Sequence, residues 1–149
     1  MIQRIQSLWL LLAFGTAILM YFFPVIQLTP ENGLYIFDYD SISIAGIDNL
    51  IQSGYIVAGL LGIIAFLSFV GIFLFKKRML QMRICTFISL LIIFLVGLIT
   101  YFSLSSGNKV AATIGLSAIL PIIIFIFVLM ARRAVKKDED LVKSVDRIR

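Results

Sequence analysis

The polar stretch over residues 28–50 holds the residue types closest to chemistry in this chain. Its two serines lie near carboxylates, but the stretch has no His or Lys to serve as the base that a serine nucleophile needs. The run DYDSISIAG spaces Asp38 and Asp40 like the first ligands of a calcium loop, yet Ile42 stands at the next ligand position. Catalysis is therefore disfavoured. A solvated loop, a partner-binding face and a weak divalent-cation site stay open as interpretations. The candidate partner-binding carboxylates are Glu31, Asp38, Asp40 and Asp48.

The remaining residues offer little else for catalysis or cofactor binding. There is no histidine, so a haem or di-iron centre is not expected. Cys85 is the only cysteine, which excludes an intrachain disulfide and favours a packing role for its side chain. We predict no cofactor, no metal and no enzymatic activity.

Composition points to a membrane protein, because 61% of the 149 residues are hydrophobic and only 14% are charged. Four apolar runs contain no Asp, Glu, Lys or Arg, and a helix crossing a bilayer needs about 20 such residues. The predicted spans are residues 7–28, 55–75, 84–104 and 110–130. The first lacks a small-residue cleavage site near Pro24, so we expect a retained span rather than a signal peptide. Without buried ionisable groups, a proton or ion pathway is disfavoured.

The basic residues predict orientation. All of the 13 Lys and Arg except Lys109 fall on one side of the predicted spans, which places both termini in the cytoplasm. The net charge of +5 is thus explained without a nucleic-acid partner. Residues expected to contact anionic lipid headgroups are Arg4, Lys76, Lys77, Arg78, Arg83, Arg132, Arg133, Lys136 and Lys137.

The two predicted outer connections differ in length. Residues 29–54 form the larger loop, in which the turn former PENG lies between VIQL and LYIF and predicts a short β-hairpin. Residues 43–54 could form a short interfacial helix leading into the second span. Residues 105–109 are expected to be only a tight turn.

Several residues inside the spans predict packing rather than function. Pro121 falls near the middle of the fourth predicted span and is expected to kink it, with a gating hinge as the alternative. Pairs of small residues that would let helices approach are Ala13 and Ala17, Ala58 and Gly62, and Ala111 and Gly115. Hydroxyl groups expected to bond carbonyls of their own helices are those of Thr16, Ser68, Ser89, Thr100 and Ser117.

The tail, residues 131–149, is predicted to continue the fourth helix into the cytoplasm. Leu141, Val145 and Ile148 would share one face of such a helix. Either a solvated helix end or a docking helix for a cytoplasmic partner would show this pattern.

The opening MIQRIQSLWLLLA, with Trp9 at its aromatic position, resembles a family of small uncharacterised membrane proteins from Bacteroidetes-type bacteria. The resemblance extends over the whole chain and includes the four-span plan, the larger outer loop and the basic tail. It implies the bacterial inner membrane, with the larger loop in the periplasm. No functional residue is carried over, because the family's function is unknown.

The sequence therefore predicts a single all-α domain over residues 1–149, a four-transmembrane-helix bundle with both termini cytoplasmic. For function we favour a non-enzymatic accessory or scaffold subunit of an envelope complex, with a membrane protein partner. A binder of lipid or another apolar ligand within the bundle is the alternative, and a small channel or transporter is the second alternative.

Overall fold

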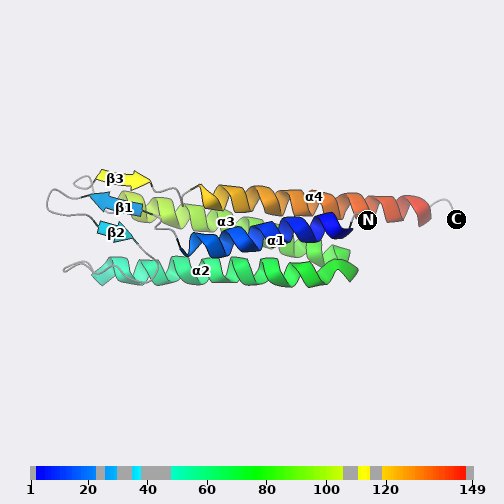
Figure 1. Ribbon diagram of the computed structural model, residues 1–149, viewed down its shortest axis with the longest axis horizontal. Helices are drawn as coiled ribbons and strands as arrows, with labels where there is room; N and C mark the ends of the chain where they lie inside the picture. The colour runs from blue at the N-terminus through cyan, green and yellow to red at the C-terminus, as the bar shows by residue number, and fades with distance from the viewer. Residues whose placement is uncertain are drawn as a thin grey trace.

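The computed structural model describes residues 3–22, 26–29, 35–37, 48–105, 111–114 and 119–146. Within these ranges the chain forms four long helices, one short 3₁₀ helix and three strands (Figure 1). In chain order they are α1 (Gln3–Met20), β1 (Ile26–Thr29), β2 (Tyr35–Phe37), α2 (Asp48–Phe73), η1 (Leu74–Lys76), α3 (Arg78–Ser105), β3 (Ala111–Ile114) and α4 (Leu120–Asp146).

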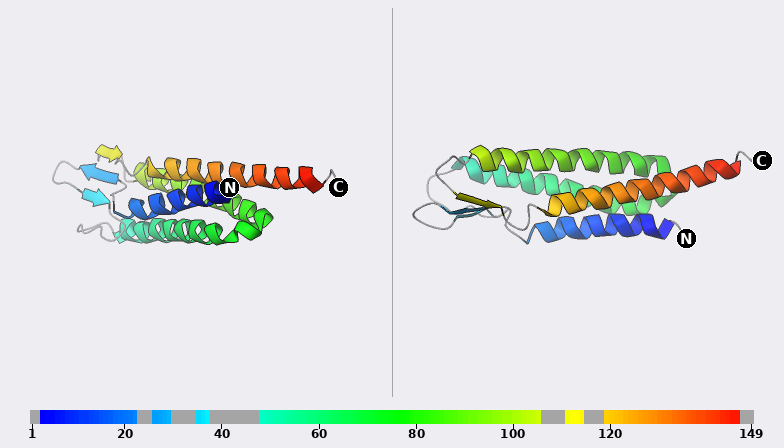
Figure 2. Two further views of the ribbon diagram at one scale, coloured as in Figure 1. Left: turned by 45° about the vertical axis from the view of Figure 1, so that its right-hand side comes forward. Right: turned by 90° about the horizontal axis from the view of Figure 1, so that it is seen from above.

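The four helices form an antiparallel bundle, with α1 packed on α2 and α4, and α3 packed on the same two helices (Figures 1 and 2). We call the end that holds η1, the start of α1 and the C-terminal part of α4 the turn end. The opposite end, which carries the strands, is the sheet end. Both chain termini lie toward the turn end, and α4 projects beyond the other helices there.

The bundle core follows one spacing in all four helices, because buried residues recur at alternating steps of four and three. The buried stripes are Gln6, Leu10, Ala13, Ala17 and Met20 in α1; Val57, Leu61, Ile64, Ser68 and Gly71 in α2; Gln81, Cys85, Ile88, Ile92 and Leu95 in α3; and Ile124, Val128, Ala131, Val135 and Asp138 in α4. This seven-residue repeat is typical of helices packed at small crossing angles. Its small residues let the helices approach closely.

Three short strands form an antiparallel sheet in the order β2-β1-β3. The hairpin predicted around PENG is confirmed, since Ile26 pairs with Phe37 and Leu28 pairs with Tyr35. Strand β3 is unpredicted, and it places Ile26 opposite Ile114 on the other edge of β1. The sheet thereby joins the connection after α1 to the connection after α3.

The structure corrects two predicted spans. The first does not reach residue 28: α1 ends at Met20 and Leu28 is in a strand, in keeping with the inability of Pro24 to continue a helix. The fourth does not begin at residue 110, because α4 starts at Leu120. Pro121 is consequently in the first turn of α4, where its missing N–H costs no helical hydrogen bond. The predicted mid-helix kink is wrong.

The connections are corrected as well. Because α3 ends at Ser105 and β3 follows at Ala111, α3 and α4 are not joined by a tight turn at residues 105–109. Ala111 lies in β3, so the predicted helical pair with Gly115 does not exist. The second helix already begins at Asp48, which makes the described part of the predicted interfacial helix continuous with α2. Residues 43–47 lie outside the described residues.

Two segments, Tyr55–Phe73 and Arg78–Tyr101, are long and apolar enough to cross a membrane. Ile5–Met20 is a shorter apolar helix. In α4 only Leu120–Ala131 is continuously apolar, and this segment is shorter than a full membrane span, which needs about 20 residues. All four helices expose large apolar side chains on their outer faces, as Leu11, Phe66, Phe94 and Ile126 show.

Polar hydroxyls inside the helices are satisfied locally, as predicted. Thr16 Oγ1 donates to the Leu12 carbonyl, and the same i−4 bond is made by Ser68, Ser89 and Thr100. Ser117 lies outside the described residues. Cys85 is fully buried in the core, which agrees with its predicted packing role.

Candidate functional site at the turn end

The predicted partner-binding carboxylates are not brought together by the part of the chain that the structure describes. Glu31, Asp38 and Asp40 lie outside it. Asp48 is the first residue of α2, at the sheet end. The proposed role of this outer loop therefore stays a prediction.

The predicted lipid-contacting cations, in contrast, belong to elements that meet at the turn end (Figure 1). Arg4 is in the first turn of α1 and Lys76 is in η1, but the structure describes only the backbone of these two residues. The exposed members are Lys77, Arg83, Arg132, Arg133, Lys136 and Lys137, while Arg78 is half-buried. Lys109, the predicted exception, also lies outside the described residues.

An ion pair between half-buried Arg78 and buried Asp138 connects the α2–α3 turn to α4. The Lys77 N–H donates to the Leu74 carbonyl over 2.9 Å and closes η1, so that α3 begins at Arg78. From there Arg78 Nε lies 2.9 Å from Oδ2 of Asp138. That oxygen receives no aligned hydrogen bond from a described group, so the contact is best described as electrostatic. A carboxylate as buried as Asp138, which is 9% exposed, needs such a cation.

Two buried glutamines make further links between helices at the same end. Gln6 Nε2 donates to the Ala134 carbonyl over 3.3 Å and ties α1 to α4. Gln81 Nε2 donates to the Gly71 carbonyl over 3.1 Å and ties α3 to α2. Gln6 is 1% exposed and Gln81 is 0% exposed. Both amides are oriented by their bonds, since a flipped amide would face a carbonyl with its own oxygen.

Gln6, Gln81 and Asp138 are the turn-end members of the buried stripes in their helices, and together we call them the polar layer. The apolar core thus ends in side chains that carry hydrogen-bonding groups. Oε1 of Gln6, Oε1 of Gln81 and Oδ2 of Asp138 are buried without a hydrogen-bond donor among the described groups. Each of the two glutamine oxygens costs about 1–3 kcal/mol unless it is bonded, for example by ordered water, whereas Oδ2 of Asp138 has the Arg78 cation beside it.

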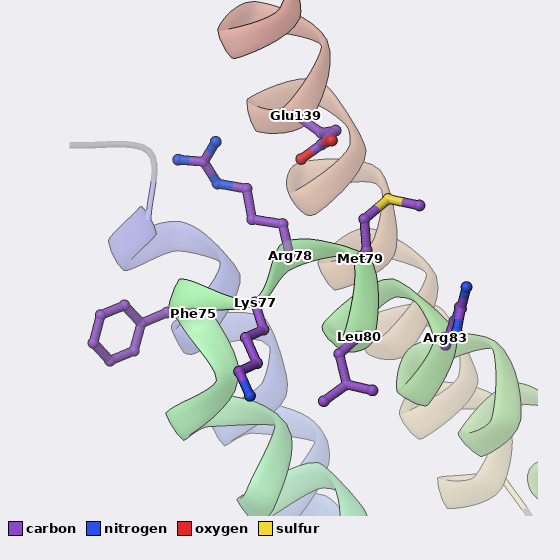
Figure 3. A pocket seen from close by; sticks show the side chains of 7 residues that line it. All are labelled: Phe75, Lys77, Arg78, Met79, Leu80, Arg83 and Glu139. Carbon is purple, nitrogen blue, oxygen red and sulfur yellow. The ribbon is translucent and has the colours of Figure 1, made fainter.

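Beside this layer a hollow of about 820 Å³ opens at the junction of η1 and α3. Its lining residues, shown in Figure 3, are Phe75, Lys77, Arg78, Met79, Leu80, Arg83 and Glu139. Lys77 and Leu80 extend toward the body of the bundle, whereas Arg78 and Met79 reach toward the Glu139 region of α4. The hollow combines three cations with one carboxylate and three apolar side chains, a set suited to an anion that carries apolar groups.

Sequence reasoning missed the polar layer, although a signal was present. It assigned no packing role to Gln6, Gln81 or Asp138. All three continue the four-and-three spacing of the apolar residues in their helices, and this spacing predicts that they face the core.

The described residues define the class of protein: a bundle of four helices, two of which are apolar enough to cross a membrane. A small sheet lies at one end. The opposite end is basic, and its helices are connected by hydrogen bonds and an ion pair. Residues 2–148 match the family described as "Domain of unknown function (DUF4293)", and the chain belongs to that family. Comparisons with curated proteins and with solved structures found no match.

Proposed function

We propose that the chain is an integral protein of the bacterial inner membrane in which all four helices are embedded and both termini are cytoplasmic. Support comes from the packing: α1 and α4, whose apolar segments are shorter, lie along α2 and α3, so the two long apolar segments would carry them into the bilayer. The apolar outer faces suit contact with lipid. The basic residues gathered at the turn end favour that end as cytoplasmic.

Within that membrane we propose that the protein acts as a non-enzymatic accessory or scaffold subunit. The observation that carries this proposal is the extension of α4 beyond the bundle (Figure 2). The base of this extension is fixed by the hydrogen bond from Gln6 to the Ala134 carbonyl and by the ion pair between Asp138 and Arg78. Past Asp138 the helix exposes Leu141 and Val142, at 45% and 40%. A helix that is anchored at its base and presents apolar side chains near its end is suited to dock a protein partner.

The alternative functions receive less support. A ligand held between the helices would need a pocket of about 300–1,000 Å³. The groove lined by Ile92, Pro121 and Phe125 among others holds about 180 Å³. A channel would need polar groups facing a path, but the hydroxyls of Thr16, Ser68 and their like are bonded within their own helices.

The test is purification of the tagged chain from its native membrane in mild detergent, followed by mass spectrometry of the retained proteins. We expect a stoichiometric partner that is lost when Leu141→Ser and Val142→Ser are combined. The matched control combines Asp140→Ala with Ser144→Ala, two exposed polar positions on the same helical segment, and should keep the partner. A parallel Asp38→Ala, Asp40→Ala variant shows whether the outer loop contributes. Recovery of the chain alone would contradict the scaffold function.

A further inference from the structure

The hollow at the junction of η1 and α3 contains two kinds of cation. Arg78 is held by Asp138 and forms part of the wall. Lys77 and Arg83 are exposed, and neither makes an ion pair with another residue in the described ranges. Both line the same hollow, in which Glu139 is the single carboxylate. Two exposed cations that line one hollow provide positive charge for an anionic group such as a phosphate.

The apolar lining specifies what the anion is attached to. Phe75, Met79 and Leu80 are all exposed large hydrophobic residues at this hollow. They stand where the two longest apolar helices end and begin, at Phe73 and Arg78. A free phosphate gains nothing from such side chains, whereas a phospholipid places its headgroup beside cations and its acyl chains beside apolar residues.

We propose that this hollow binds an anionic phospholipid, with Lys77 and Arg83 as the ligands of its phosphate and with Leu80 and Phe75 against the upper part of its acyl chains. The inference rests on the proposed membrane embedding, which puts the turn end at the level of the lipid headgroups. It goes beyond general attraction of a basic surface to the membrane, because it assigns one lipid to one place. Arg78 acts as a positioning residue, since its pairing with Asp138 fixes the α2–α3 turn.

The test is native mass spectrometry of the full chain in detergent, titrated separately with phosphatidylglycerol and with zwitterionic phosphatidylethanolamine. We expect preferential retention of phosphatidylglycerol. Combining Lys77→Gln with Arg83→Gln should lower its affinity about ten- to thirtyfold, as expected for two headgroup contacts. The matched control combines Lys143→Gln with Arg147→Gln, which removes two cations of the tail that are outside the predicted lipid-contacting set and should change the affinity less than twofold, within about 0.4 kcal/mol.

Three results would overturn the site. Equal losses in both double variants would mean a diffuse basic surface. Displacement of the lipid by excess inorganic phosphate would mean that phosphate alone is recognised. Unchanged affinity in the Leu80→Gln variant would mean that the acyl chains make no contact there. If the Lys77, Arg83 double variant does not fold, the two single variants, each at an exposed position, replace it and should each lower the affinity at least about threefold.

The same preparations separate this proposal from the proposed function. Resistance of the chain to extraction from membranes by alkaline carbonate tests the embedding on which both depend. A chain that resists extraction but shows no lipid preference contradicts only the lipid site. A chain that keeps its lipid preference but purifies without a protein partner contradicts only the scaffold function.

Discussion

Nε of Arg78 lies 2.9 Å from Oδ2 of Asp138, so the first residue of α3 is tied to the last position of α4 whose described side chain is buried. The pair joins two residues that are 60 positions apart in the chain. It also stands at the base of the α4 extension, next to the Gln6 bond to the Ala134 carbonyl. The extension is therefore held at its base from two neighbouring helices.

Breaking this pair from one side should be costly. In the Arg78→Met variant, the Asp138 carboxylate stays buried without its cation, and loss of one partner of a buried pair costs about 3–5 kcal/mol. Because the side chains of Arg78 and Asp138 retain 22% and 12% exposure, we expect a smaller loss of about 2–3 kcal/mol. The measurement is the free energy of unfolding in mixed micelles of increasing dodecyl sulfate content. The exposed Arg133→Met control should change it by less than about 0.5 kcal/mol.

Replacing both partners supplies the complementary test. The Arg78→Met, Asp138→Leu variant leaves no buried charge, so we expect it to be more stable than Arg78→Met alone by at least about 1 kcal/mol. Equal stability of the single and double variants would show that burial of Asp138 imposes no charge penalty in this fold.

The contact between α1 and α2 at Gly62 gives a second prediction. The Tyr21 hydroxyl donates to the Ala58 carbonyl, and a Cβ at Gly62 would lie 3.1 Å from the Tyr21 oxygen. Gly62→Ala should therefore displace the hydroxyl and leave the free energy of unfolding about 1 kcal/mol below that of Gly59→Ala in the same helix, because a hydrogen bond is usually worth about that much. Gly59→Ala, one turn away with nothing within 4 Å of the added Cβ, should be neutral or stabilising by up to about 1 kcal/mol.

The same measurement in a Tyr21→Phe background separates the two effects at Gly62. Without the hydroxyl, the alanine at position 62 has no oxygen to displace, so its cost should fall close to that of Gly59→Ala. A cost that persists in this background would locate the crowding elsewhere in the α1–α2 contact.

The position of Pro121 gives a third prediction. A proline in a helix interior costs about 3 kcal/mol, so its replacement by alanine there would stabilise the protein. In the first turn of α4 no such gain is available, and the buried ring borders the groove with Ile92 and Phe125. We expect Pro121→Ala to lower the free energy of unfolding by no more than about 1 kcal/mol. Ile126→Pro, at an exposed site inside the helix, should lower it by about 3 kcal/mol or more. A large gain from Pro121→Ala would restore the kink prediction.

Hydropathy and charge predicted the parts of the fold that depend on composition. The four helices, the hairpin around PENG and the i−4 bonds of Thr16 and Ser68 follow from residue types alone and are confirmed. The basic residues were expected on one side, and the elements that carry them meet at the turn end. Such features need no knowledge of which helix packs on which.

The unpredicted parts depend on tertiary pairing. Residues 110–120 are almost uniformly apolar, so hydropathy does not separate strand β3 from the start of α4. Pro121 marked that boundary, but its preference for a first turn was outweighed by the length of the apolar run. Gln81 and Asp138 were missed because their partners, the Gly71 carbonyl and Arg78, are brought to them only by the bundle.

The last prediction tests the register of the sheet together with the orientation in the membrane. Gln27 and Thr113 are register partners in β1 and β3, and such antiparallel Cα pairs lie about 4.5–5.5 Å apart, within reach of a disulfide. We expect Gln27→Cys with Thr113→Cys, in a Cys85→Ala background, to become cross-linked in cells without added oxidant, because the proposed orientation puts the sheet end in the oxidising periplasm. The measurement is the number of maleimide groups taken up under denaturing conditions, by intact mass.

Moving the second cysteine two residues, to Ala111→Cys, opens the Cα separation to about 7–8 Å and should leave both thiols free. If the Gln27→Cys, Thr113→Cys pair becomes cross-linked only after an oxidant is added, the result would support the register but contradict the orientation. If no cross-link forms under either condition, the result would contradict the β1–β3 pairing itself.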